Sequence, residues 1–76
     1  MKDLVEVIVQ ALVDYPEEVE VFEVEGTTTL ILELKVAKQD IGKVIGKRGR
    51  TAEAIRAILS AAAGKLKKGV VLEIIE

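Results

Sequence analysis

Polar side chains recur every fourth residue near the N-terminus, at Glu6, Gln10 and Asp14. This spacing aligns them in one stripe of a helix and turns the apolar residues between them toward a core. We expect a helix within DLVEVIVQALVDYP that ends close to Tyr15, before Pro16. The side chains expected to face the core are Leu4, Val5, Ile8, Ala11 and Leu12. Because the run is rich in β-branched residues, a strand is the alternative.

The pattern then changes to a period of two. EVEVFEVEG alternates apolar and acidic residues except for a slip at Val21-Phe22, and Gly26 separates it from TTTLILELKVA. We expect a β-hairpin with one face on the core, and the slip indicates a β-bulge. The core-facing residues of the second strand are expected to be Leu30, Leu32, Leu34 and Val36. VVLEIIE, at the C-terminus, predicts one more strand.

Two helical patterns separate the hairpin from the last strand. QDIGKVIG predicts a short helix capped by Asp40, and RTAEAIRAILSAAAGKLKKG predicts a longer helix that ends near Gly64. The side chains that we expect the longer helix to bury are Ile55, Ile58, Leu59 and Ala62. The element order is therefore α-β-β-α-α-β, and a right-handed βααβ crossover makes its two strands parallel. The predicted fold class is α+β, one domain over residues 1–76 with a three-stranded mixed sheet and three helices on one face.

Composition excludes several classes of function. The 76 residues include neither Cys nor His, so we expect no thiolate or histidine metal site, no cofactor and no histidine-based catalysis. Most carboxylates fall on the predicted strands, away from any plausible pocket, so an enzyme is not expected. Charged residues interrupt each apolar run well before the roughly 18 residues that a membrane span needs. We expect a cytoplasmic protein with a thin core.

Acidic and basic residues are segregated along the chain. Residues 1–34 contain nine acids and one base, a net charge of −8, whereas residues 35–69 contain ten bases and two acids, a net charge of +8. Such asymmetry indicates a basic surface for a polyanion, provided that the fold keeps the two parts separate. The alternative is an ordinary solvated helix face.

The stretch IGKVIGKRGRTAEAI, residues 41–55, carries the clearest signal for function. Gly46 and Gly49 bracket Lys47 and Arg48 between the two predicted helices. Glycines permit positive φ and close approach of another backbone, and the start of the following helix offers free amides and a positive dipole end. These features favour a chain of phosphates. The alternative for the two glycines is a helix C-cap followed by an ordinary turn.

Two nucleotide-binding motifs do not fit this stretch. A Walker P-loop needs a glycine followed by lysine five residues after its first glycine, but Lys47 lies five residues after Gly42 and Thr51 five after Gly46. The dinucleotide-binding pattern also fails, because no strand leads directly into the glycines. A two-glycine loop with basic tips inside a βααβ unit is instead how a KH domain clamps about four nucleotides of single-stranded nucleic acid.

VIGKRGRTAEAIRAIL resembles the GxxG core of KH domains, and α-β-β-α-α-β is the type II order. A type I domain would add a helix after the last strand. Over its whole length, including VEVIVQALVDYPEEVEV and LSAAAGKLKKGVVLEIIE, the chain is similar to the small stand-alone bacterial KH proteins of the KhpA family. The resemblance implies binding of single-stranded RNA, an RNA-chaperone or post-transcriptional role, and links to cell-envelope and cell-length control. It also implies a homodimer, and a heterodimer with a larger KH-containing partner.

This interpretation predicts roles for individual residues. Gly46, Lys47, Arg48 and Gly49 are expected to clamp the RNA backbone, and the further basic candidates are Lys43, Arg50 and Arg56. For Arg56, well inside its helix, a plain surface position is the alternative. Lys65, Lys67 and Lys68 either extend the basic surface or interact with the last carbonyls of their helix.

A narrow groove for bases is expected beside the loop. The residues predicted to form its floor are Ile41, Val44 and Ile45, with Val36 and Ala37 from the second strand, and a purely structural core role is the alternative for each. The two aromatic residues, Tyr15 and Phe22, fall in the acidic part of the chain, so base stacking worth about 1–3 kcal/mol per base is not expected. The rival function is a protein-interaction module in which the fold serves mainly as a dimer or partner contact.

Overall fold

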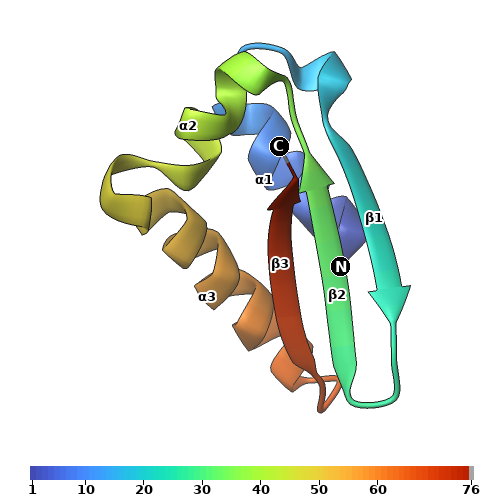
Figure 1. Ribbon diagram of the computed structural model, residues 1–76. Coiled ribbons are helices and arrows are strands. Elements are labelled where there is room, and N and C mark those ends of the chain that lie inside the picture. The colour runs from blue at the N-terminus through green and yellow to red at the C-terminus, as the bar shows by residue number, and fades with distance from the viewer. Residues whose placement is uncertain (76) are drawn as a thin grey trace.

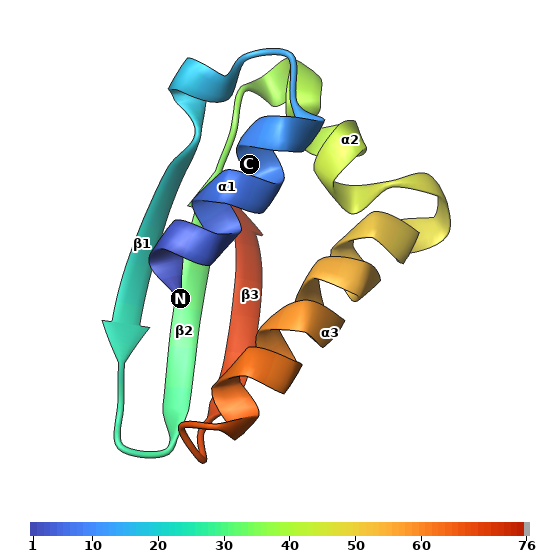
Figure 2. The same ribbon diagram turned by 180° about the vertical axis from the view of Figure 1, so that it is seen from behind.

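A three-stranded sheet carries the helices on one side (Figures 1 and 2). The computed structural model describes residues 1–75. The strands are β1 (Glu20–Glu25), β2 (Thr29–Lys35) and β3 (Gly69–Ile75); the α-helices are α1 (Lys2–Leu12), α2 (Ile41–Ile45) and α3 (Arg50–Gly64). Three short 3₁₀ turns complete the chain: η1 (Pro16–Glu18), η2 (Lys38–Asp40) and η3 (Lys47–Gly49). The predicted order α-β-β-α-α-β is confirmed.

The central strand β2 organises the sheet. It pairs antiparallel with β1 and parallel with β3, which confirms the hairpin and the βααβ crossover. Alternate residues Leu30, Leu32 and Leu34 of β2 are buried, as the period of two predicts. The pairing of β1 with β2 is continuous from Glu20–Lys35 to Glu25–Leu30, so the predicted bulge is wrong. Val21 simply faces the core, and its neighbour Phe22 faces the opposite side.

Helix α1 packs against the sheet through a narrower stripe than its sequence pattern predicts. Val5 and Val9, one turn apart, are fully buried, whereas Leu4, Ala11 and Leu12 are exposed and Ile8 is half-buried. The prediction of the inward face is therefore correct for Val5 but wrong for Leu4, Ala11 and Leu12. More apolar residues occur on α1 than one helix can turn toward a narrow sheet, so the polar stripe does not fix the rotation of the helix.

Helix α3 shows a similar rotation. It buries Ile55 and Leu59 as predicted, together with Ala52 and Ala63. Ile58 is 48% exposed, so its predicted burial is wrong. The stripe of α3 that faces β3 has small residues at both ends, which lets the helix lie close to the sheet. Among residues 1–75, ten buried side chains form one contiguous hydrophobic cluster: Val5, Val9, Val21, Leu32, Leu34, Val36, Val44, Ile55, Leu59 and Leu72.

Candidate nucleic-acid interface

The chain between α2 and α3 forms a tight loop at residues 46–49, here called the GxxG loop. Gly46 has φ +76°, Arg48 +58° and Gly49 +73°, so three of the four residues adopt positive φ. The amide of Gly46 donates to the carbonyl of Gly42 at 2.8 Å, which closes α2, and the amide of Gly49 donates to the carbonyl of Gly46 at 3.1 Å. The loop is thus a tight hydrogen-bonded turn that joins α2 directly to α3.

The two glycines are required for different reasons. A Cβ at Gly46 would lie 2.1 Å from the Oγ1 of Thr51 and 2.8 Å from the Thr51 amide nitrogen, far inside van der Waals contact. A Cβ at Gly49 would meet nothing within 4 Å, so only its positive φ favours glycine there. Gly46 therefore sets the close approach of the loop to α3, and Gly49 sets the direction in which α3 begins.

Three exposed cations surround the loop. Lys47, Arg48 and Arg50 all project from the surface. Arg48 occupies the left-handed region, which is uncommon for a residue with a side chain and costs about 1 kcal/mol or more. Gly49 is the N-cap of α3 and contributes no side-chain cap, so the first amides of a 15-residue helix stay free of side-chain partners. The amide of Arg50 already donates to the carbonyl of Lys47 within the loop. The positive end of the α3 dipole and the exposed cations nevertheless make this an anion-binding surface.

Lys43, the first cation before the loop, is already paired in the structure. Its Nζ donates to the Asp14 carboxylate at 2.7 Å and lies 3.7 Å from Oδ1 of Asp40. The hydrogen bond to Asp14 raises the pKa of Lys43 above its ordinary value, so the amine stays protonated at neutral pH. Lys43 lies at the predicted site, but its charge is partly neutralised by Asp14.

Asp40 acts differently from the prediction. Its side chain makes no hydrogen bond to cap α2, and it is fully buried. The two carboxylate oxygens instead accept the backbone N–H groups of Asp14 at 3.2 Å and Tyr15 at 3.0 Å. Asp40 thereby ties the segment after α1 to the start of α2 and fixes the helix that carries the loop. A buried carboxylate needs such partners, but nothing in the sequence indicates which amides supply them.

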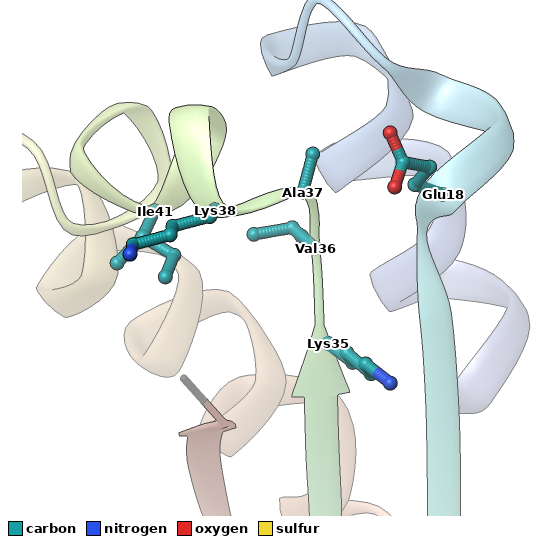
Figure 3. Close-up of a pocket in the computed structure, with 6 residues that line it drawn as sticks. All are labelled: Glu18, Lys35, Val36, Ala37, Lys38 and Ile41. Atoms are coloured by element: carbon teal, nitrogen blue, oxygen red, sulfur yellow. The ribbon is translucent and has the colours of Figure 1, made fainter.

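A cavity of about 570 Å³ lies at the end of β2, beside the start of α2 (Figure 3). It brings together Val36, Ala37 and Ile41, three of the five residues predicted to form a groove floor. Val44 does not line the cavity: it is fully buried and packs the inner side of α2 into the core, which is the structural alternative to a groove role. Ile45 is exposed at the other end of α2 and does not line the cavity. The remaining lining residues, which the sequence analysis did not single out, are Glu18, Lys35 and Lys38.

The other predicted cations lie along α3 and after it. Arg56 donates to the carbonyl of Leu72 at 3.5 Å, so its side chain bridges α3 and β3. Lys68 pairs with Glu25 of β1, and this contact lowers the pKa of the Glu25 carboxyl through a hydrogen bond. Lys65 and Lys67 are exposed near the far end of α3 from the GxxG loop.

The fold and the loop together define a class of protein. A basic two-glycine loop between the helices of a βααβ crossover, in the order α-β-β-α-α-β, is a KH domain of type II. The chain belongs to the KhpA/KhpB KH-domain family, whose model matches residues 2–74.

Relatives of high sequence identity match the chain over its whole length. The "RNA-binding protein KhpA" of Clostridium acetobutylicum is 60% identical over 75 residues, which cover 99% of this chain and 100% of that protein. Proteins of the same name from Chlamydia caviae and Aquifex aeolicus are 55% and 50% identical; each match covers 100% of this chain, and 97% and 96% of the relative. These names describe RNA-binding proteins and no enzyme. No solved structure matches the chain with significance. Among residues 1–75, no helix is long and apolar enough to cross a membrane.

Proposed function

We propose that the chain binds single-stranded RNA in the cytoplasm by holding its sugar-phosphate backbone at the GxxG loop. The observation that carries this proposal is the loop itself: positive φ at residues 46, 48 and 49, with Lys47 and Arg48 exposed immediately before the N-terminus of α3, which has no side-chain cap. Gly46 holds the loop against α3, Gly49 leaves open space where the RNA backbone can approach, and the two cations contact phosphates. The names of the full-length relatives support an RNA ligand over another polyanion.

Bases leave the clamped backbone toward the cavity at the end of β2. Its apolar floor of Val36, Ala37 and Ile41 accepts a base face, and Lys35 and Lys38 offer donors to base edges. Neither Tyr15 nor Phe22 lines the cavity, so bases pack against aliphatic side chains instead of stacking on aromatic rings. Binding is therefore weak and only loosely specific for sequence, as suits an RNA chaperone or a post-transcriptional regulator.

The salt dependence of binding tests the clamp. If the loop and its neighbours neutralise roughly three to four phosphates, the slope of log K against log salt is about −2 to −3, at about −0.7 per phosphate for single strands. Fluorescence anisotropy with a labelled oligouridine over a series of potassium chloride concentrations gives this slope. A slope near zero would mean that the basic segment does not contact the RNA.

Asp14 is expected to weaken RNA binding, because its carboxylate holds the Lys43 amine at 2.7 Å. Asp14→Asn removes the shorter of the two carboxylate contacts of Lys43 and leaves Asp40 at 3.7 Å. With Lys43 more available to a phosphate, we expect RNA affinity to rise by about two- to fivefold and the salt slope to steepen by up to about 0.7. Asp3→Asn is the matched control, because it removes the same charge from the exposed start of α1. If both variants change the affinity equally, only net charge matters and Lys43 is not a phosphate contact.

A dimer is the second part of the proposal, and the exposed face of α3 supports it. Ala54, Ala57, Ile58 and Ala61 follow helical spacing along α3, and all four are exposed. Small residues around one large apolar side chain let two helices approach closely. We propose that this α3 stripe joins two copies, or one copy and a larger KH-containing partner, so that two weak clamps act on one RNA. Linking two sites can raise avidity by about 10² to 10⁴ without a new contact.

Ile58→Glu tests the α3 stripe. A carboxylate in the centre of an apolar helix contact must be desolvated, so we expect the dimer dissociation constant to rise by at least about tenfold. Val7→Glu on α1 is the control, because Val7 is an exposed apolar side chain outside the stripe. Sedimentation equilibrium over a concentration series gives both values. A wild-type chain that stays monomeric at all concentrations would refute the dimer and leave the RNA clamp as a separate proposal.

A further inference from the structure

The face of the sheet that points away from the helices has no covering element among the described residues. Figure 1 looks onto this face with α1 behind the strands, and Figure 2 shows α1 and α3 on the other side. Core packing of Val21, Leu32 and Leu72 fixes which residues alternate to the outside. The strand register then places them in cross-strand rows, of which two are Val24–Ile31–Val71 and Phe22–Glu33–Glu73. We call this surface the open face.

The first row makes the open face apolar. Val24 is 54% exposed, Val71 43%, and Phe22 of the adjoining row 48%, with Ile31 half-buried between them. These side chains are contiguous, because each is a direct or next cross-strand neighbour of another. A clustered apolar patch of this kind marks an interaction surface more often than scattered single residues do.

The second row adds an unusual charge arrangement. Glu33 and Glu73 are register partners on the parallel strands β2 and β3, so two carboxylates stand side by side on the same face. Within residues 1–75 neither of them takes part in the ion pairs that the structure forms. Like charges directly opposite each other destabilise a sheet. A cation placed between them from outside would remove this repulsion.

The third row shows what kind of partner fits. It consists of Glu20, Lys35 and Ile75, so the open face carries three carboxylates and one amine around its apolar centre. The negative balance repels the phosphates of RNA. It also disfavours a second copy of this face, because stacking two copies would bring Glu33 and Glu73 of both together.

We propose that the open face docks a basic amphipathic segment of another protein, with an arginine or lysine between Glu33 and Glu73 and apolar side chains on Val24, Ile31 and Val71. Arginine suits the position best, because its planar group can bridge two carboxylates and lie against the ring of Phe22. The docked segment lies on the side of the sheet opposite the helices (Figures 1 and 2). Docking on the open face does not depend on the RNA clamp; only the further consequence, that the chain links an RNA to a protein, rests on the proposed function.

A model peptide tests the open face directly. The probe is a synthetic amphipathic helix of about 16 residues, roughly four turns, with leucine on one face and arginine on the other. A second peptide with serine in place of leucine has the same charge. We expect the leucine peptide to shift the backbone amide signals of the ¹⁵N-labelled full chain along β1, β2 and β3, and the serine peptide to bind at least about tenfold more weakly.

Matched variants separate docking from general charge attraction. Glu33→Gln with Glu73→Gln should weaken binding of the leucine peptide by at least about tenfold. The same pair should raise the melting temperature of the chain by removing the repulsion between the two carboxylates. Glu17→Gln with Glu53→Gln changes the net charge equally at exposed positions on η1 and α3, and should weaken binding less than about threefold. Equal weakening by both pairs, or signal shifts confined to α1 or α3, would overturn the proposal. So would self-association of the Glu33→Gln/Glu73→Gln chain, which would show that a second copy is the natural occupant.

Discussion

Replacing Lys47 and Arg48 together by aspartate is expected to lower RNA affinity by at least about 30-fold and to leave the fold intact. The substitutions remove two phosphate contacts and put two carboxylates against the RNA backbone, and about 1.4 kcal/mol is tenfold in affinity. Both side chains are exposed, and aspartate tolerates the left-handed conformation of Arg48 better than most residues do. The free energy of unfolding should therefore change by less than about 0.5 kcal/mol.

A closely matched control lies near the other end of α3. Lys65 and Lys67 are also exposed, and Lys67 also adopts positive φ, at +57°. Lys65→Asp with Lys67→Asp changes the net charge by the same amount far along α3 from the GxxG loop, so we expect less than about a threefold loss of affinity. Anisotropy titrations and circular dichroism measure the two properties. Equal losses in both variants would show that RNA responds to net charge and not to the loop.

Gly46→Ala should be the most damaging single substitution in the loop. The new Cβ would lie 2.1 Å from Thr51 Oγ1, 2.6 Å from Thr51 Cβ and 2.8 Å from the Thr51 amide nitrogen, and the residue would keep φ +76°. We expect the free energy of unfolding to fall by about 2–4 kcal/mol, which is a large part of the total stability of a chain of this size. Urea denaturation followed by circular dichroism gives the value.

Gly49→Ala separates steric clash from backbone strain. The Cβ there would meet open space, so only the positive φ is unfavourable and the expected loss is about 1 kcal/mol. Adding Thr51→Ala to Gly46→Ala should restore only part of the lost stability, because the Cβ and the backbone nitrogen of residue 51 would still lie too close to the new Cβ at position 46. If the two glycine variants lose the same stability, the contact between the loop and α3 is not what requires Gly46.

Much of the fold follows from periodicity alone. The change from a spacing of about four to a spacing of two at the hairpin, and back again before the GxxG loop, predicts the order of helices and strands that the structure has. The parallel pairing of β2 with β3 also follows, because a right-handed crossover leaves few alternatives. These are local properties, or rules of chain connection, and a single sequence contains them.

What periodicity does not predict is how far a helix rotates against its neighbours. Ile58 satisfies the pattern of a buried residue as well as Leu59 does, yet α3 turns Leu59 into the core and leaves Ile58 exposed. The same competition exposes Leu4 on α1 and turns Val44 of α2 into the core. In each case the width of the sheet and the position of the other helices decide, and these are known only once the chain is assembled.

In the candidate site, too, features local in sequence could be predicted and contacts between remote residues could not. Gly46, Lys47, Arg48 and Gly49 could be found in the sequence, because a loop carries its chemistry in adjacent residues. The contacts of Asp40 join residues 25 and 26 positions apart, and no local pattern indicates them. The pairing of Lys43 with Asp14 is equally remote in sequence, although it decides how much of that positive charge is free to meet RNA.

The most direct test of RNA binding at the GxxG loop is the map of backbone amide shifts of the ¹⁵N-labelled chain titrated with an oligouridine of about eight nucleotides, roughly twice the length that one KH domain holds. We expect the largest shifts at residues 46–51, with smaller ones at Ile41 and along the adjoining surface of α3. Saturable binding with all shifts confined to β1 and to the open face of the sheet, and none at residues 46–51, would contradict it.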